Sequence, residues 1–132
     1  PSLSWIRFTS LSCKSGCLPL VDESTLNRCL NALKSNKAVV PYVELKDSIR
    51  EFKGDNSISR DRKNYVSVQT PQCFDLKLIH KAYQGEYQEI FTDDASVAEN
   101  SGMEIYLVKG NEENLKITTP IDFKIAESLI KK

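Results

Sequence analysis

Short apolar runs alternate with amphipathic helical patterns along most of this chain, and this alternation limits the folds that it can adopt. Ala38 to Val43 is apolar and β-branched, as strands are, and Ile105 to Val108 has the same character. Residues at helical spacing flank both runs. The order favours an α/β fold in which helices cover a mainly parallel sheet. At 132 residues, a single domain is expected.

Four helices are expected, because each helical pattern follows a residue that can cap a first turn. The last start is the most specific, since Thr119 and Pro120 precede Asp122 and so combine a hydroxyl cap, a first-turn proline and an acid. The other expected caps are Asp22 or Ser24, Asp75 and Asp93. The apolar residues expected to face inward are Leu26, Cys29, Leu30 and Leu33 in the first helix, Leu76, Ile79 and Tyr83 in the second, and Phe123, Ala126, Leu129 and Ile130 in the last.

The stretch from Glu44 to Tyr65 is mostly charged and lacks the apolar residues for a core of its own. Gly54-Asp55-Asn56 lies near its middle and favours a tight turn, so we expect a long two-stranded hairpin. A ribbon of this kind is marginally stable alone and needs a surface to lie against, such as a second subunit. Pro41 has no N–H to donate, so we expect the preceding strand to end there or to lie at a sheet edge.

The charge balance bears on the partners of the protein. The chain has 18 Lys and Arg residues and 18 Asp and Glu residues, so its formal net charge is zero. A dedicated nucleic-acid-binding protein would normally carry a basic excess, so no nucleic-acid partner is expected. The apolar runs are far shorter than a bilayer span, so no membrane partner is expected either.

The four cysteines bear on the compartment. Cys29 lies on the expected buried face of the first helix, where a thiol packs as a small apolar group. Cys13 and Cys17 resemble half of a zinc site, but zinc needs four ligands and His80, expected to be an exposed helix residue, is the sole histidine. We therefore favour reduced cysteines and a cytoplasmic protein.

Three polar clusters follow expected strands, at the position where ligands bind in open α/β sheets. The clusters are Lys46-Asp47-Ser48 with Arg62, Thr92 to Ser96, and Glu113 to Pro120 with Lys116. The first has an alternative interpretation as a solvated face of the hairpin, and the acids of the second as helix caps. For Lys116 the alternative is weaker, because Leu115 and Ile117 flank it in an expected short strand and its ammonium then faces away from them, toward an anion.

Four segments, in this order and at these spacings, resemble the 2-C-methyl-D-erythritol 4-phosphate cytidylyltransferase family. They are Val40-Pro41-Tyr42-Val43 continuing through Lys46-Asp47-Ser48-Ile49, Gln69-Thr70-Pro71-Gln72-Cys73-Phe74, Thr92-Asp93-Asp94-Ala95-Ser96, and Asn114-Leu115-Lys116-Ile117-Thr118-Thr119-Pro120 with Asp122, Ala126 and Glu127. The resemblance implies α/β architecture, as part of a doubly wound (Rossmann-like) nucleotidyltransferase sheet. It also implies a protruding β-arm, at about residues 44–65, that hooks a twin chain in a homodimer.

The resemblance implies an enzyme that joins CTP and methylerythritol phosphate, with Mg²⁺ as cofactor. Ser48 stands where the family usually has a threonine on the arm that touches the methylerythritol phosphate of the neighbouring subunit. Arg62 matches the arm arginine that binds the phosphate of that substrate. Thr92 matches a substrate-contacting hydroxyl, and Lys116 matches the lysine that neutralises phosphates at the reaction centre.

The chain also departs from the family pattern. Residues 1–18 do not match it, so we divide the chain into 1–18 and a family portion at 19–132. The family's Gly-rich loop for the CTP triphosphate has no counterpart, and where the family has a His-Asp-Ala-x-Arg-Pro motif this chain has Lys14 to Pro19, of which only Pro19 agrees. The 132 residues alone are therefore expected to be inactive. Two alternatives stay open: a pentitol-phosphate (ribitol 5-phosphate) cytidylyltransferase, and a non-catalytic dimerisation or binding module.

Overall fold

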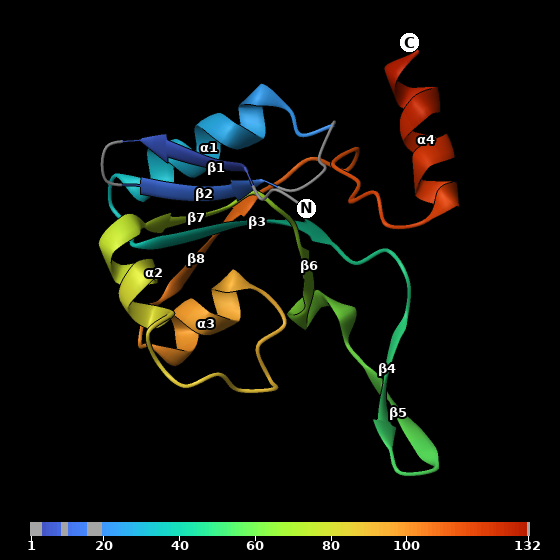
Figure 1. The fold of residues 1–132 in the computed structure, drawn as a ribbon. Helices are drawn as coiled ribbons and strands as arrows, with labels where there is room; N and C mark the ends of the chain where they lie inside the picture. The colour runs from blue at the N-terminus through green and yellow to red at the C-terminus, as the bar shows by residue number, and fades with distance from the viewer. Residues whose placement is uncertain (1–3, 9–10, 16–19, 132) are drawn as a thin grey trace.

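In the computed structural model the described residues are 4–8, 11–15 and 20–131 (Figure 1). Strands and helices both occur along them, but the expected alternation is only partial, because β3 to β7 follow one another with only a 3₁₀ turn between them. In chain order the elements are β1 (Ser4–Phe8), β2 (Leu11–Ser15), α1 (Glu23–Leu33), β3 (Ala38–Glu44), β4 (Ile49–Lys53), β5 (Asn56–Arg60), the 3₁₀ turn η1 (Arg62–Asn64), β6 (Val66–Val68), β7 (Gln72–Asp75), α2 (Leu76–Ala82), α3 (Asp94–Asn100), β8 (Ile105–Lys109) and α4 (Pro120–Ile130).

One sheet forms the centre of the molecule (Figure 1), with the strand order β1-β2-β7-β3-β6 and with β8 also paired to β3. The pair β3 and β8 is parallel, whereas the other pairs among the described strands are antiparallel. The α/β class is confirmed, but the expectation of a mainly parallel sheet is wrong. The reason is that the chain leaves β3 through the hairpin and returns along β3 as β6 and β7 without a crossover helix.

The position of Pro41 differs from the expected sheet edge, because β3 has neighbours on both sides. On one side β7 pairs with Ala38 and Val39, and β6 pairs with residues from Tyr42 onward. Pro41 lies in the gap between these two partners, where no ladder bond needs its missing N–H. Its carbonyl oxygen still accepts a hydrogen bond from the Gln69 amide at 2.7 Å. A proline is therefore tolerated in a central strand at the point where the strand changes partners.

Helices cover both faces of the sheet (Figure 1). On one face α1 packs Cys29 and Leu33 against the strands, in a cluster of buried residues with Val39, Cys73 and Val108. On the other face the buried cluster is made by Ala38 and Phe74 of the sheet, Ile79 of α2 and Ala98 of α3. The expected caps Asp22, Asp75, Asp93 and Thr119 each accept a hydrogen bond from a first-turn N–H. The capping residues in the sequence thus predicted the starts of all four helices correctly.

The cysteines differ in state. Cys29 is a free thiol, and burial raises its pKa to about 11. Cys73 is disulfide-bonded, so the expectation of reduced cysteines holds for Cys29 and is wrong for Cys73. The pairing of β2 with β7 sets the Cα of Cys13 opposite that of Cys73, a proximity that spacing along the chain does not reveal. Cys17, half of the rejected zinc pair, lies outside the described residues.

The expected hairpin is present as β4 and β5, a separate two-stranded sheet that projects from the body (Figure 1). Its register runs from Ile49 opposite Arg60 to Lys53 opposite Asn56, and Gly54 makes the turn with a positive φ of 61°. Phe52 near the tip is 89% exposed, so the hairpin has no core of its own in the described chain.

Helix α4 stands apart from the sheet (Figure 1). Of the residues expected to face inward, Ala126 is buried and Leu129 is half-buried, but Phe123 and Ile130 are exposed. The expectation is wrong for these two because α4 follows an irregular segment and has no extensive contact with another helix or strand in the part of the chain that the structure describes. None of the helices built from the described residues is long and apolar enough to cross a bilayer.

Candidate functional site

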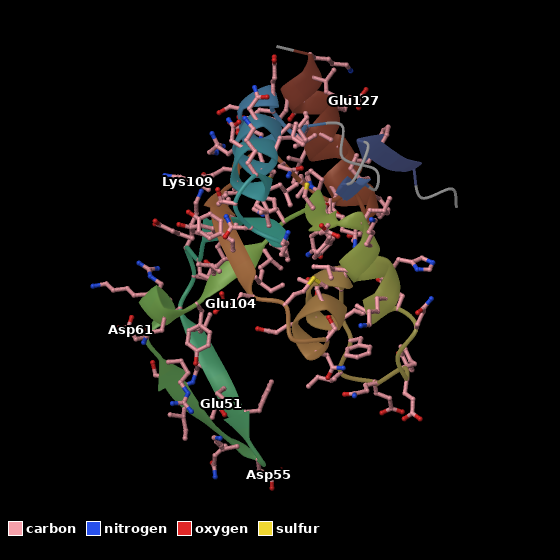
Figure 2. The ribbon with its side chains drawn as sticks, turned by 90° about the vertical axis from the view of Figure 1, so that its left-hand side faces the viewer. Glu51, Asp55, Asp61, Glu104, Lys109 and Glu127 are labelled. Carbon is pink, nitrogen blue, oxygen red and sulfur yellow. The ribbon has the colours of Figure 1, made fainter. Side chains whose placement is uncertain are left out.

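The parallel strands β3 and β8 bring two of the expected polar clusters to one edge of the sheet. Tyr42 lies opposite Lys109 in the register, so both strands end at the same side. From there β3 continues to Lys46 and the hairpin, whose base and tip are marked by Asp61 and Asp55 in Figure 2. After β8 the chain enters the irregular segment 110–119, which carries Lys116. This edge is where ligands bind in open α/β sheets.

Side-chain contacts tie the base of the hairpin to this segment. The ammonium of Lys46 forms an ion pair with Glu112, and Arg62 donates from Nη1 to the backbone oxygen of Lys46. The hydrogen bond to Glu112 raises the pKa of Lys46 and lowers the pKa of the carboxylate. Both side chains are largely exposed, so the pair adds little stability. Lys46 is thus paired with Glu112 in this structure, whereas Arg62 makes no ion pair with another described residue.

Ser48 and Arg62 lie on the two arms of the hairpin base. Ser48 is exposed directly before β4, and Arg62 is exposed in η1 directly after β5. Asp61 caps η1 by accepting a hydrogen bond from the Lys63 amide at 3.0 Å. Because Ile49 pairs with Arg60 in the register, Ser48 and Arg62 lie at the same end of the ribbon, which is its base. The exposed guanidinium and hydroxyl are therefore available to a ligand outside this chain's own core.

Lys116 is exposed in an irregular segment, so the expected short strand is wrong. Its local structure starts with a tight turn in which the Leu115 amide donates to the Glu113 oxygen at 2.7 Å. The alternation inferred from the sequence nevertheless holds, because Leu115 and Ile117 are half-buried while Lys116 faces solvent. The ammonium is thus presented on the open side of the segment.

Thr92 lies directly before α3, a helix that packs on the face of the sheet opposite to α1. Its amide donates to Ser96 Oγ at 3.2 Å, and Asp93 completes a capping box with Ser96, which confirms the helix-cap interpretation of this acid. A pocket of about 290 Å³ is lined by ten residues that include Thr92, Asp94 and Tyr83. No hydrogen bond or ion pair among the described residues joins Thr92 to Lys116 or Arg62. The polar contacts of the described residues therefore do not link Thr92 directly to the other candidate residues.

The start of α3 is fixed by buried polar contacts that the sequence did not reveal. Gln72 in β7 is 3% exposed, donates to Asp93 Oδ2 at 2.7 Å and accepts from the Ala95 amide at 3.0 Å. Tyr83 donates its hydroxyl to the buried Asp94. Burial, followed by this hydrogen bond, raises the pKa of Tyr83. These contacts hold the loop that presents Thr92.

Three amide side chains, Gln69, Asn111 and Asn114, also received no role from the sequence. Asn111 Nδ2 donates to the Leu20 oxygen at 2.9 Å, and its Oδ1 accepts from Thr25 Oγ1 at 3.2 Å, so it joins the start of α1 to the end of β8. The signal that could have marked them is their position beside the expected site segments. Their partners lie far away along the chain, so spacing could not identify them.

A larger hollow of about 890 Å³ lies away from the candidate residues. Its lining includes Lys37, Lys81 and Glu104. Glu104 directly precedes β8, so this hollow lies toward the end of β8 that is opposite to Lys109 (Figure 2). None of the four candidate residues lines it. The candidate cations instead lie at the carboxyl ends of β3 and β8, so the candidate site is there and not in this hollow.

Asp122 is the acid of the capping box that starts α4, and its carboxyl group should have a lowered pKa. Its Oδ2 accepts from the Thr118 amide at 3.0 Å and the Thr119 amide at 2.8 Å, which lowers its pKa below the ordinary 3.8. The hydrogen bonds that the Asp122 carboxylate accepts should therefore persist at neutral pH, and their contribution to stability should be lost only as the pH falls through this lowered pKa. A ¹³C carboxyl NMR titration should give a value below 3.8, and Thr118→Val, which removes one donor, should raise it. A value at or above 3.8 in the unaltered chain contradicts the prediction.

Comparison with known proteins adds to this geometry. The family model described as 2-C-methyl-D-erythritol 4-phosphate cytidylyltransferase matches residues 13–132. A curated relative of that name from Phocaeicola vulgatus is 44% identical over 115 residues, covering 87% of this chain and 52% of its own length. A relative of the same name from Bacteroides fragilis is 43% identical over the same length and coverage. This chain thus spans about half the length of the curated relatives that it matches.

Solved structures agree. A 4-diphosphocytidyl-2C-methyl-D-erythritol synthase from Anaerococcus prevotii superimposes with a TM-score of 0.83 and 30% identity, over 93% of this chain and 57% of that one. The 2-C-methyl-D-erythritol 4-phosphate cytidylyltransferase from Thermus thermophilus gives a TM-score of 0.75 and 29% identity, over 86% of this chain and 58% of that one. The family match covers most of the chain, and the fold agrees with it. The chain belongs to the 2-C-methyl-D-erythritol 4-phosphate cytidylyltransferase family.

Proposed function

We propose that this chain supplies the methylerythritol-phosphate-binding part of an enzyme that joins CTP and 2-C-methyl-D-erythritol 4-phosphate, giving 4-diphosphocytidyl-2-C-methylerythritol and pyrophosphate. The observation that carries the proposal is the family match over residues 13–132. The exposed cations Arg62 and Lys116 support it, because both come from segments at the carboxyl ends of β3 and β8.

The chemistry of this reaction suits such a site. The nucleophile is a phosphate monoester, whose second pKa near about 6 leaves it largely dianionic at neutral pH. It therefore needs no general base. It needs cations that bring two polyanions together in line and absorb the charge that develops on the α-phosphate of CTP. Arginine and lysine side chains provide this.

Each candidate residue has a role in the proposal. Arg62 binds the phosphate of methylerythritol phosphate, since its planar guanidinium can donate two parallel hydrogen bonds. Ser48 and Thr92 offer hydroxyls to the substrate. Lys116 stabilises the negative charge that forms on the reacting phosphate.

A homodimer through the hairpin is part of the proposal. Ser48 and Arg62 lie at the base of the ribbon β4–β5, which projects from the body (Figure 1). Thr92 directly precedes α3, and no hydrogen bond or ion pair among the described residues joins it to Ser48 or Arg62. A hairpin from a second copy would bring these residues to the Lys116 side of its neighbour. The ribbon would then gain the surface that a two-stranded sheet needs for stability.

Mg²⁺ and a cytoplasmic location also stay proposals. The residues that the structure describes include no group of three or more His, Cys, Asp or Glu side chains able to hold a metal ion. They therefore do not fit a protein-built magnesium site, and no step here depends on one. The location is argued from the substrates, because charged phosphates do not cross membranes unaided. The disulfide of Cys73 does not favour this location, so alkylation of intact cells followed by mass spectrometry tests it: a reduced Cys73 would support the location and an oxidised Cys73 would contradict it.

A chimera tests the proposed activity directly. Residues 19–132 would replace the matching half of the Phocaeicola vulgatus relative, which supplies the half that this chain does not match. With CTP, Mg²⁺ and methylerythritol phosphate, we expect steady pyrophosphate release and none from the 132-residue chain alone. Preference for ribitol 5-phosphate would favour the pentitol-phosphate alternative. A folded chimera without activity on either substrate would favour a non-catalytic module.

Arg62→Ala should weaken binding of methylerythritol phosphate to the chain by about 10- to 100-fold, because a charge-assisted hydrogen bond contributes about 1.5–3 kcal/mol. NMR titration of the intact chain measures this affinity, and analytical ultracentrifugation measures the oligomeric state, which should not change. Lys63→Ala, an exposed neighbour in the same 3₁₀ turn, is the matched control. Equal affinities for the two variants would remove Arg62 from the site.

A further inference from the structure

The position of Lys116 raises the question of what holds its segment, since residues 113–118 form neither helix nor strand. On the C-terminal side, the segment is held by the start of α4. Asp122 Oδ2 accepts hydrogen bonds from the amides of Thr118 and Thr119, and Asp122 N donates to Thr119 Oγ1 at 3.3 Å. The chain is thus anchored two residues after Lys116.

On the N-terminal side the anchor is the buried amide of Asn114. This residue is 6% exposed, and its Nδ2 donates to the Thr70 backbone oxygen at 2.6 Å. Gln69 Nε2 donates to the backbone oxygens of Asn111 at 2.9 Å and Asn114 at 3.3 Å. Two amide side chains therefore tie the segment to the chain between β6 and β7, two residues before Lys116.

The packing around Gln69 leaves little freedom. Gly110 lies against it so closely that a Cβ built on the glycine would be 2.1 Å from Gln69 Oε1. The Gly110 amide donates to the Tyr42 oxygen at 2.8 Å, which fixes this backbone to β3. Any side chain at position 110 would force Gln69 out of its place. The side-chain amide of Gln69 therefore packs directly against the backbone of Gly110.

The two amides cost the protein stability as well as provide contacts. Gln69 Oε1 and Asn114 Oδ1 are buried and have no hydrogen-bond partner among the described residues. A buried acceptor without a donor is unfavourable, so stability alone does not account for amides here. Their donor groups, in contrast, hold three backbone oxygens of two separate segments.

We infer that Asn114 and Gln69 are positioning residues that set the place of the Lys116 ammonium by anchoring its segment to the β6–β7 connection. Only residues 115–117 lie between the two anchors, and Leu115 and Ile117 are half-buried, so Lys116 is confined to a short span. The inference rests on the proposed function in one respect, namely that Lys116 contacts a phosphate. The anchoring itself depends only on the fold.

The test uses the intact chain, with Asn114→Ala and Gln69→Ala as variants and the exposed Asn100→Ala as matched control. The first readout is the ¹⁵N order parameter of the Lys116 amide. We expect about 0.85 in the unaltered chain and the control, and less than about 0.6 in the two variants. The second readout is the Kd for methylerythritol phosphate, which should rise about tenfold although no charge has changed. If Asn114→Ala does not fold, as judged by circular dichroism, Gln69→Ala carries the test.

The outcomes separate the two proposals. An order parameter that stays high in the variants overturns the inference, whatever the affinity. A lowered order parameter with unchanged affinity, while Lys116→Ala weakens binding, also overturns it, because phosphate binding then does not need the anchoring. A lowered order parameter with no loss of affinity in Lys116→Ala supports the anchoring and contradicts the proposed role of Lys116.

Discussion

Lys116→Ala in the active chimera should lower kcat by about 10²- to 10³-fold, which corresponds to about 2.7–4 kcal/mol of lost transition-state stabilisation. The lysine is exposed on the open side of its segment, flanked by half-buried Leu115 and Ile117. Its charge is proposed to act on a phosphate whose negative charge grows in the transition state, so kcat should suffer more than KM. Steady-state pyrophosphate release over a range of both substrates measures the two constants.

The matched control for this variant is Lys124→Ala. Lys124 is an exposed lysine of α4, a few residues away, and it makes no ion pair with another described residue. Both variants remove the same charge from the protein, so a general electrostatic effect would act on both. A kcat for Lys116→Ala equal to that of the control would refute the assignment.

Phe74→Ala should lower the free energy of unfolding of the chain by about 3–5 kcal/mol, the usual loss for a large aromatic residue in a core. Phe74 is 0% exposed and packs with Ala38, Ile79 and Ala98 between the sheet and α2 and α3. Its removal leaves a cavity that the three neighbouring small or branched side chains cannot fill. For a domain of this size, the melting temperature should fall by about 10–15 °C.

Phe123→Ala provides the matched control for the stability prediction. Phe123 in α4 is 60% exposed, so the same substitution there should change stability by less than about 1 kcal/mol. Urea unfolding followed by circular dichroism, under one fixed redox condition because Cys73 is disulfide-bonded, measures both variants. Equal losses in the two variants would show that this face of the sheet is not a packed core.

The helices could be predicted from the sequence because their signals are local. Asp22, Asp75, Asp93 and Thr119 each cap the helix that begins at the next residue. The strand β7 was not expected, because four residues of mixed character carry no pattern of their own and become a strand only through their neighbours β2 and β3. The direction of strand pairing is non-local for the same reason.

The candidate site divides in the same way. The exposure of Lys116 between Leu115 and Ile117 follows from adjacent residues, and its segment was placed by resemblance. The anchoring by Asn114 and Gln69 could not be predicted, since their hydrogen bonds join residues 42 to 45 positions apart. The ion pair of Lys46 with Glu112, 66 positions away, could not be predicted for the same reason.

The length of the hairpin strands sets how far the hairpin reaches from the body. Each of its strands has five residues, which gives it a reach of about 17 Å beyond its base at about 3.4 Å per residue. One extra residue in each strand would turn every side chain beyond it to the opposite face, whereas two in each strand would keep the faces and lengthen the ribbon by about 7 Å. In the proposed homodimer, the distance between the two bodies would therefore change in steps of about 7 Å if the faces of the ribbon are kept.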